Sequence, residues 1–488
     1  MMTPDSSDGD PWDPIVLSLD GGGVKGLSSL YILREIMRQI KRLDEVDVED
    51  NRLEPNSDQQ LPLPCHYFDF MIGTSTGGLI AIMLGRLRMG VNECIQQYLI
   101  FSNAIFRPPR RRLIQHYSRR KLQEAAKTVV KKFCPNHQNN RADCNGDEYL
   151  RQNDYDEQGD AASDPKYANR TCRVAVMTVR EGGENNFRSD TSDVAILFRS
   201  YNHRRRRIGA KSEMNPRTLE DAKLRIHEAC GATTAAPTYF RPVVIKGRKY
   251  IDGGVHANNP AIYAWNEAMQ MSNPPGRPGN KKPYALVSIG TGMSQKHNRI
   301  KLRSLISFAA KKIVDTEEAH LQAESLIHQL ERTYFRFNIP AQPRLYPEHK
   351  GLAKINMTSC DKTRKKSYIK PSRPDPGAST GTATISGQRT LEQLAAHDDR
   401  RLQEIAAETH KGGFKPQKYK YITFEKIRDR TIAYCGSELR DGTLVMSKID
   451  DCARMLRGQS LKRRNLERNS PNGAPAVRSL VQFRNPGF

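Results

Sequence analysis

The chain has 488 residues, of which 37% are hydrophobic and 27% charged, and its formal net charge is +24. This length allows two or three domains, and the low hydrophobic share indicates a folded region accompanied by long polar segments. The N-terminus is polar and acidic, and the longest apolar runs fall well short of the ~20 residues that a membrane-spanning helix needs. We therefore expect no secretory signal, no transmembrane segment and a cytoplasmic location.

Three clusters of basic residues contribute to the positive charge: Arg107–Arg112, Arg119–Lys121 and Arg204–Arg207. Charge of this kind attracts anionic membrane surfaces and nucleic acid alike. Nucleic-acid-binding modules also carry a recognisable reading motif, and the sequence contains none. We expect peripheral contact with an anionic membrane and no nucleic-acid partner. The plainer alternative, that the clusters are solvated loops, stays open.

The first predicted elements are a strand, a glycine-rich loop and a helix. The β-branched run Ile15–Leu19 predicts a buried strand, and apolar residues at helical spacing predict a helix from Leu27 to Leu43. The loop between them, residues 20–26, reads DGGGVKG. Such a loop points several free backbone N–H groups at one place, where they can bind a phosphate or stabilise an oxyanion.

The glycine loop also fits the dinucleotide-binding pattern G-x-G-x-x-G through Gly21, Gly23 and Gly26. Two features argue against a dinucleotide. Asp20 directly precedes the loop, where its carboxylate would repel a pyrophosphate, and the acidic residues about twenty positions later lie in a polar insertion with no preceding strand. An oxyanion hole fits better, and a plain packing turn remains the bland alternative.

A second strand-to-helix junction contains a serine. Residues Gly73–Gly77 read GTSTG, with apolar runs before them at Tyr67–Ile72 and after them at Leu79–Leu84. In this setting a G-x-S-x-G turn lifts the serine hydroxyl clear of the backbone, because the glycines make room for a sharp turn. Ser75 is therefore the candidate nucleophile. The turn residues around it are Gly73, Thr74, Thr76 and Gly77.

A nucleophilic serine needs a base within hydrogen-bond distance. Asp252 follows a predicted hairpin at residues 243–251 and is followed by Gly253 and Gly254, which would allow the serine a close approach. Asp252 is therefore a candidate base in a two-residue system. Among the histidines, His227 and His256 are the most suggestively placed, but neither stands in a convincing strand-loop context.

The remaining elements continue the alternation of strands and helices. Further strands are predicted at residues 172–179, 194–198, 286–290 and 334–339. Further helices are predicted at residues 91–106, 224–231, 302–330 and 391–410. This alternation favours an α/β fold of three layers, with helices on both faces of a mostly parallel central sheet.

Composition divides the chain into five parts. These are a polar tail at 1–13, a folded domain at 14–340 with its motifs at about 15–292, a linker or long loop at 341–390, a helical extension at 391–457, and a basic, disordered tail at 458–488. Inside the domain, a loop rich in Asn, Asp and Gly at about 134–169 is predicted to be exposed and mobile.

Nine cysteines are scattered along the chain without a repeating spacing. Cys134 and Cys144, with His137 between them, are a weak indication of a metal site. The spacing lacks the close C-x-x-C pairs of structural zinc sites. Reduced thiols and no bound metal are the expected state.

Taken together, DGGGVKG at 20–26, GTSTG at 73–77 and DGG at 252–254 resemble the patatin-like phospholipase family in order and spacing. Residues 232–240 and the segment SIGTG at 288–292 add to the resemblance, which covers about residues 14–340. It implies a patatin-like α/β/α fold and a calcium-independent lipid acyl hydrolase that needs no cofactor and cleaves fatty-acyl esters of phospholipids or related lipids through a Ser-Asp dyad.

The resemblance also implies roles for individual residues. Ser75 would be the nucleophile and Asp252 its base, within the motif completed by Gly253 and Gly254. Backbone N–H groups of the loop would form the oxyanion hole; the loop residues are Gly21, Gly22, Gly23, Val24, Lys25 and Gly26. Lys25 stands where the family more often has arginine, so it keeps the positive charge but lacks the bidentate geometry.

Two alternatives remain. A catalytically silent lipid-binding protein of the same fold is one, although the intact Ser75 and Asp252 argue against it. A Ser-His-Asp esterase that uses His256 is the other. The substrate lipid and the oligomeric state stay open.

Overall fold

A computed structural model describes the protein over the following residues: 14–46, 61–105, 117–134, 144–151, 172–181, 194–201, 223–237, 239–272, 282–293, 316–340, 352, 422–439 and 441–468. The predicted linker at 341–390 lies outside the described residues except for Leu352, and the predicted helix at 391–410 lies outside them altogether. The same holds for the first part of the predicted helix at 302–330, which is described only from residue 316.

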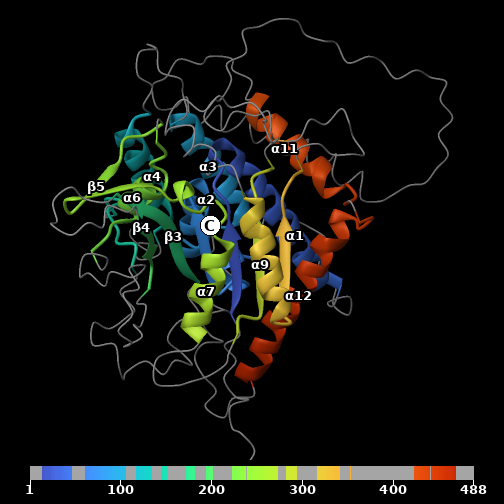
Figure 1. The fold of residues 1–488 in the computed structure, drawn as a ribbon. Coiled ribbons are helices and arrows are strands. Elements are labelled where there is room, and N and C mark those ends of the chain that lie inside the picture. The colour runs from blue at the N-terminus through green and yellow to red at the C-terminus, as the bar shows by residue number, and fades with distance from the viewer. Residues whose placement is uncertain are drawn as a thin grey trace, which may run out of the picture.

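One sheet of eight strands forms the centre of the described part of the protein (Figure 1). Its strands are β1 (Ile15–Leu19), β2 (Phe70–Thr74), β3 (Arg173–Arg180), β4 (Val194–Arg199), β5 (Val243–Ile245), β6 (Arg248–Asp252), β7 (Ala285–Ile289) and β8 (Thr333–Phe337). The order across the sheet is β5-β6-β3-β2-β1-β7-β8, with β4 also paired to β3. Five neighbouring strands are parallel to one another: β3, β2, β1, β7 and β8. β4 and β6 each pair antiparallel with β3, and β5 pairs antiparallel with β6. The predicted mostly parallel sheet is confirmed.

Strand β3 pairs with β2 and then with β6 along the same edge. This places the serine turn after β2 beside the Asp-Gly-Gly motif at the end of β6. β4 pairs with β3 from Ala175 to Arg180, so it occupies one edge there. On the other edge β2 pairs up to Thr74 opposite Met177, and β6 takes over with Asp252 opposite Thr178. The end of β2 and the end of β6 therefore meet at neighbouring residues of one strand.

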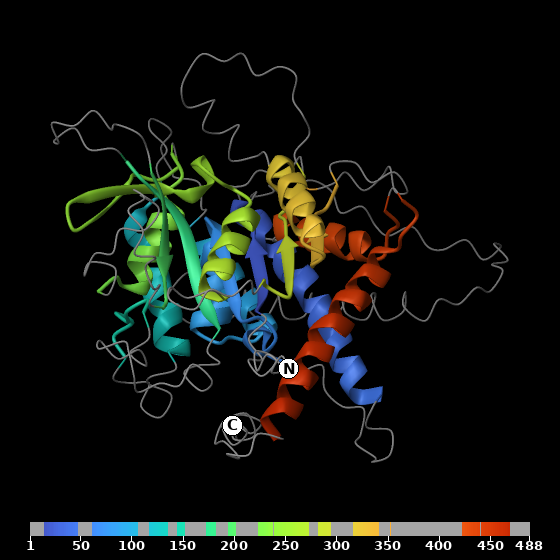
Figure 2. The same ribbon diagram turned by 60° about the horizontal axis from the view of Figure 1, so that its bottom comes forward.

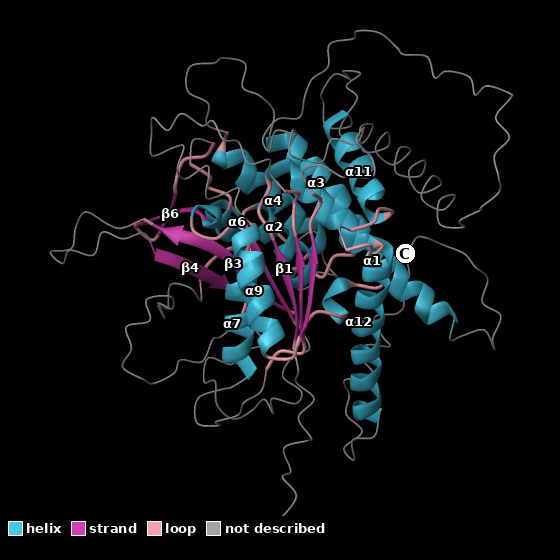
Figure 3. Ribbon diagram, turned by 45° about the vertical axis from the view of Figure 1, so that its right-hand side comes forward, coloured by secondary structure: helices cyan, strands magenta, loops and turns pink. Residues whose placement is uncertain are grey.

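Helices cover both faces of the sheet, as the alternation of elements predicts. They are α1 (Gly26–Val46), α2 (Thr76–Ala81), α3 (Val91–Ile105), α4 (Arg119–Phe133), α6 (Ile226–Thr233), α7 (Ala261–Ser272), α9 (Glu317–Gln329), α11 (Ile422–Cys435) and α12 (Val445–Arg468). A π-helical turn, Ile82–Arg86, continues α2. Helices α7 and α9 pack on one face in a core around Trp265, and α1 and α3 pack on the other in a larger core that includes α11 and α12. Figure 3 shows the strands between these two groups of helices.

The C-terminal helices are part of the packed domain. Val445, Ile449 and Leu456 of α12 are fully buried in the larger core, and α12 crosses over α1 in Figure 2. The helix continues to Arg468, so the boundary of the disordered tail predicted at residue 458 is wrong. The packing of α12 on α1 carries the helix through Gly458.

Residues 144–151 also differ from expectation. They belong to the loop predicted to be exposed, yet Cys144 and Leu150 are buried. Two backbone hydrogen bonds, Leu150 N–H to Leu224 O and Ile226 N–H to Glu148 O, tie this segment to the start of α6. Among the described helices, none is both long and apolar enough to cross a membrane.

Candidate active site

Ser75 lies between the end of β2 and the start of α2, at the turn that the sequence predicts. Its φ of 53° is in the left-handed region, which is uncommon for a residue with a side chain. A Cβ on Gly73 would overlap the backbone of Gly77, and a Cβ on Gly77 would overlap the carbonyl groups at the end of β1. Both positions therefore require glycine, and the turn presents the serine hydroxyl beside the carboxyl ends of the parallel strands.

Asp252 approaches this serine from the end of β6. The Ser75 hydroxyl donates a hydrogen bond to Asp252 Oδ2 at 2.6 Å, and the Gly254 N–H donates to Oδ1 at 2.7 Å. Both carboxylate oxygens thus have a donor from the described residues, and neither donor is a histidine. A Cβ on Gly253 would overlap Met177 of β3, so glycine is needed for the chain to turn there.

The carboxyl group of Asp252 is buried, with 1% of the residue exposed. Burial raises the pKa of Asp252 from its ordinary value of 3.8 to about 7, and the hydrogen bonds from Ser75 and Gly254 oppose this rise. A carboxyl group whose pKa lies near neutral pH can both accept and return a proton under physiological conditions. This matches the demands on a general base that must also act as an acid.

The glycine loop lies directly against Ser75. A Cβ on Gly21 would come within 3.1 Å of the Ser75 Cβ and would overlap the side-chain oxygen of Asn258. The Gly21 N–H donates to Asn258 O at 3.1 Å, and the Gly22 N–H makes a long bond of 3.3 Å to Thr76 Oγ1. Gly21, expected as an oxyanion donor, therefore has its N–H engaged elsewhere. Among the described residues, the Gly23 and Thr76 N–H groups have no hydrogen-bond acceptor.

Buried polar side chains fix the loop from the opposite side. Arg336 of β8 donates to both carboxylate oxygens of Asp20, at 2.9 and 2.6 Å, and to Ser288 Oγ at 2.9 Å. Asn258 Nδ2 and Thr291 Oγ1 both donate to Gly21 O. Burial raises the pKa of Asp20 to about 6, and the charge of Arg336 opposes the rise, which leaves an ion pair at neutral pH.

Sequence reasoning missed these supporting residues. Arg336 lies in the predicted strand at 334–339, and a single arginine in a strand gives no sign of its partner 316 positions earlier. Thr233 was missed in the same way: its hydroxyl accepts from the Ser75 N–H at 3.0 Å and donates to Met177 O at 2.6 Å. Thr233 thereby fixes the serine turn to the end of α6.

Lys25 is the last residue of a 3-10 turn, Gly23–Lys25, that directly precedes α1. Only 7% of the residue is exposed, and burial lowers the pKa of its ammonium group to about 8. A cation buried this close to the loop would favour an anion there.

The two histidines weighed as possible bases contact other partners. His256 Nε2 lies 2.6 Å from the Tyr263 hydroxyl, and His227 Nε2 lies 2.8 Å from Asp147 Oδ1. Of the three predicted basic clusters, the structure describes the one at the start of α4, where Arg119, Arg120 and Lys121 are exposed. The clusters at 107–112 and 204–207 lie outside the described residues.

Comparisons with known proteins agree with the resemblance seen in the motifs. A family model described as patatin-like phospholipase matches residues 17–265, just over half of the chain. Human calcium-independent phospholipase A2-gamma is 25% identical over 331 residues, which cover 66% of this chain and 34% of that protein. Patatin-like protein 2 of Arabidopsis thaliana is 28% identical over 298 residues, covering 57% of this chain and 59% of that protein. The chain thus spans about a third of the length of the A2-gamma enzymes it matches.

Proposed function

This chain belongs to the patatin-like phospholipase family, and from that premise we propose that it hydrolyses fatty-acyl esters of phospholipids or related lipids through Ser75 and Asp252. The 2.6 Å hydrogen bond from the Ser75 hydroxyl to Asp252 Oδ2 carries the proposal. A serine at a strained strand-to-helix turn, bonded to a buried carboxylate, has the geometry of an activated nucleophile.

In the first step Asp252 takes the Ser75 proton as Oγ attacks the carbonyl carbon of the ester. The carbonyl electron pair moves onto oxygen, and the resulting tetrahedral oxyanion collapses to an acyl-serine. The departing alcohol, a lysophospholipid when the substrate is a phospholipid, takes the proton from Asp252. Water then repeats the sequence: it gives a proton to Asp252 and attacks the acyl carbon, and Ser75 leaves with that proton as the fatty acid departs.

The developing oxyanion needs hydrogen-bond donors that no other group has taken. The Gly23 and Thr76 N–H groups meet this requirement, and the Gly22 N–H is held only by a long bond to Thr76 Oγ1. We assign the oxyanion hole to these groups and remove Gly21 from the expected set. One such donor lowers the barrier by roughly 3–4 kcal/mol.

The enzyme would act at a lipid surface. We propose that exposed basic side chains, Arg119 to Lys121 among them, hold it on anionic lipid, since each such charge near the surface contributes about 1 kcal/mol. Binding to vesicles with and without an anionic phospholipid, at low and high salt, tests this, because salt screens the attraction.

Three variants test the catalytic assignment with phospholipid vesicles and a soluble p-nitrophenyl ester, in the presence of a calcium chelator. Ser75→Ala and Asp252→Asn should each lose at least about 10³-fold in kcat, since each removes a reacting group. His256→Ala should keep its activity, because His256 contacts Tyr263.

Two outcomes would contradict the proposal. A His256→Ala variant as inactive as Ser75→Ala would indicate a serine-histidine system. Wild-type protein with no activity on either substrate, yet with intact vesicle binding, would favour the silent lipid-binding alternative.

A further inference from the structure

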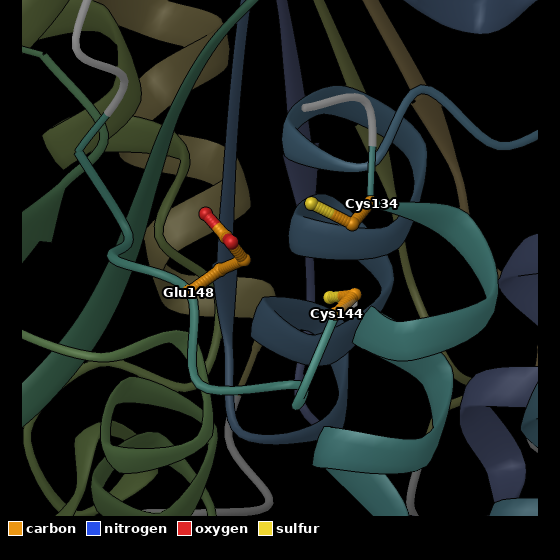
Figure 4. Close-up of side chains that lie close together, drawn as sticks. All are labelled: Cys134, Cys144 and Glu148. Carbon is orange, nitrogen blue, oxygen red and sulfur yellow. The ribbon is translucent and has the colours of Figure 1, made fainter. Parts of the chain in front are cut away.

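Two cysteines and a glutamate gather at the end of helix α4. Cys134 directly follows the helix, and Cys144 and Glu148 belong to the segment 144–151. Their sulfur and carboxylate atoms all lie within 4.8 Å of one another (Figure 4). Among the described residues, no other three His, Cys, Asp or Glu side chains come together in this way.

The sequence spacing of these cysteines argues against a metal site. Cys134 and Cys144 are too far apart in sequence to resemble a close C-x-x-C pair, but the fold returns the chain so that both sulfurs face Glu148 (Figure 4). The two thiols are buried, with 2% and 5% of the residues exposed. The third residue of the group, Glu148, lies in the same segment as Cys144. The sequence pattern does not indicate it as a metal ligand.

The segment that carries Cys144 and Glu148 is fixed on both sides. Gly146 has a φ of 79°, and a Cβ there would overlap the Lys127 carbonyl of α4. Asp147 Oδ1 lies 3.1 Å from Lys127 Nζ and 2.8 Å from His227 Nε2 of α6. These contacts, together with the backbone bonds to the start of α6, hold the two ligands in place beside α4 before any ion arrives.

We propose that Cys134, Cys144 and Glu148 form a structural zinc site. Two thiolates and one carboxylate suit Zn²⁺, whereas Ca²⁺ and Mg²⁺ prefer oxygen ligands alone. Each thiol gives up its proton to solvent when it binds, so affinity rises with pH. The carboxylate supplies a third ligand, and a tetrahedral ion would complete its coordination with water or another donor.

The site would act on the fold and not on the reaction. It would link the end of α4 to the segment that packs on α6, and α6 ends at Thr233, which holds the Ser75 N–H. No reacting atom of the proposed dyad contacts these ligands. Zinc binding at this site would therefore be independent of the proposed hydrolase activity.

Metal content and a cobalt spectrum test the proposal on the full chain, purified under reducing conditions. We expect about one zinc per chain after dialysis, and after exchange with Co²⁺ an ultraviolet thiolate-to-cobalt charge-transfer band. Cys134→Ala and Cys144→Ala should each abolish this band, and Glu148→Gln should weaken metal retention. Zn²⁺ added to the reduced apoprotein should raise its melting temperature, because an ion that binds only the folded state stabilises it.

Cys230→Ala is the matched control, since Cys230 of α6 is also a buried cysteine but lies outside the group. It should keep both the metal and the cobalt band. The proposal is overturned if the reduced protein neither retains zinc nor melts higher when Zn²⁺ is added. It is equally overturned if Cys230→Ala loses the metal as completely as Cys134→Ala, or if mass spectrometry shows a Cys134–Cys144 disulfide in protein that binds no metal after reduction.

Discussion

The proton on Asp252 determines what this carboxyl group can do. The buried setting raises its pKa to about 7, and the hydrogen bonds from Ser75 and Gly254 favour the charged form without restoring the ordinary value of 3.8. The group therefore changes its protonation state within the physiological pH range, where a freely exposed aspartate would not.

The pH dependence of hydrolysis should report this group. A base must be deprotonated to accept the Ser75 proton, so kcat/KM for a soluble p-nitrophenyl ester should fall about tenfold per pH unit below about pH 7. A neutral, soluble substrate is needed because vesicle binding has its own pH dependence. A rate that stays level down to pH 5 would show that Asp252 is not the titrating base.

The same group makes stability depend on pH. Between its unfolded pKa, near 3.8, and its folded pKa of about 7, the folded protein holds a proton that the unfolded chain has released. The contribution of Asp252 to stability is therefore fully present below pH 4 and is lost as the pH rises through 7. Asp252→Asn should melt above wild type at pH 8, with the gap closing towards pH 5. Thermal melts of both proteins between pH 5 and 8 measure this difference. A difference in melting temperature that stays constant across this range would contradict the account.

The motifs predict Ser75 and Asp252 because the backbone turns at these residues require glycines at neighbouring positions in the sequence. Gly73 and Gly77 are required by the sharp turn at Ser75, and Gly253 by the close approach to Met177, so each motif is visible in a few consecutive letters. The residues that support them carry no such local signature. Thr233 and Arg336 act over long sequence separations, and only the folded chain brings them to the site.

Strand β8 holds the glycine loop in place. Its Arg336 forms a buried bidentate pair with Asp20, the first residue of the loop after β1. The free energy of such a pair is strongly asymmetric. In the intact pair the mutual attraction compensates for part of the desolvation of the two charges, whereas removal of one partner leaves a buried charge without compensation.

Replacement of Arg336 by Met should therefore cost about 3–5 kcal/mol in the free energy of unfolding at neutral pH. The double variant Asp20→Asn, Arg336→Met should recover part of this loss, because no buried charge remains. Urea unfolding of wild type, both single variants and the double variant forms the complete cycle. Strict additivity of the single effects would show that the pair is not coupled.

The strand pattern was predictable for a physical reason, and the sharing of the β3 edge was not. Buried parallel strands appear as short apolar runs, such as those at β1 and β7, and the structure confirms these. That β2 and β6 occupy successive parts of one edge depends on pairing between strands far apart in sequence. This arrangement brings Ser75 to Asp252, and it cannot be predicted from the sequence of either strand alone.

The C-terminal helices complete the core on one face of the sheet. The basic composition of the C-terminal end predicts a disordered tail from residue 458, and α12 is polar along much of its length. Its apolar residues nevertheless form one buried side against α1, and Arg457 Nε reaches Asp44 Oδ1 of that helix at 2.7 Å. Periodicity alone cannot show which surface receives such a side, so the docking had to come from the structure.

If α12 belongs to the same cooperative unit as the sheet, its core residues should determine the stability of the whole domain. Leu456 is fully buried, so Leu456→Ala should lower the free energy of unfolding by about 2–5 kcal/mol, the usual cost of deleting a buried leucine side chain. Arg454→Ala, on the exposed side of the same helix, removes only a surface pair with Asp450 and should cost no more than about 1 kcal/mol.

Urea unfolding monitored by far-ultraviolet circular dichroism, with loss of ester hydrolysis as a second probe, measures both variants. The proposed active site lies at the ends of the strands. A cooperative domain would therefore lose activity and helicity together, at a lower urea concentration in Leu456→Ala. If helicity falls early in that variant while hydrolysis keeps its wild-type midpoint, α12 unfolds as a separate element.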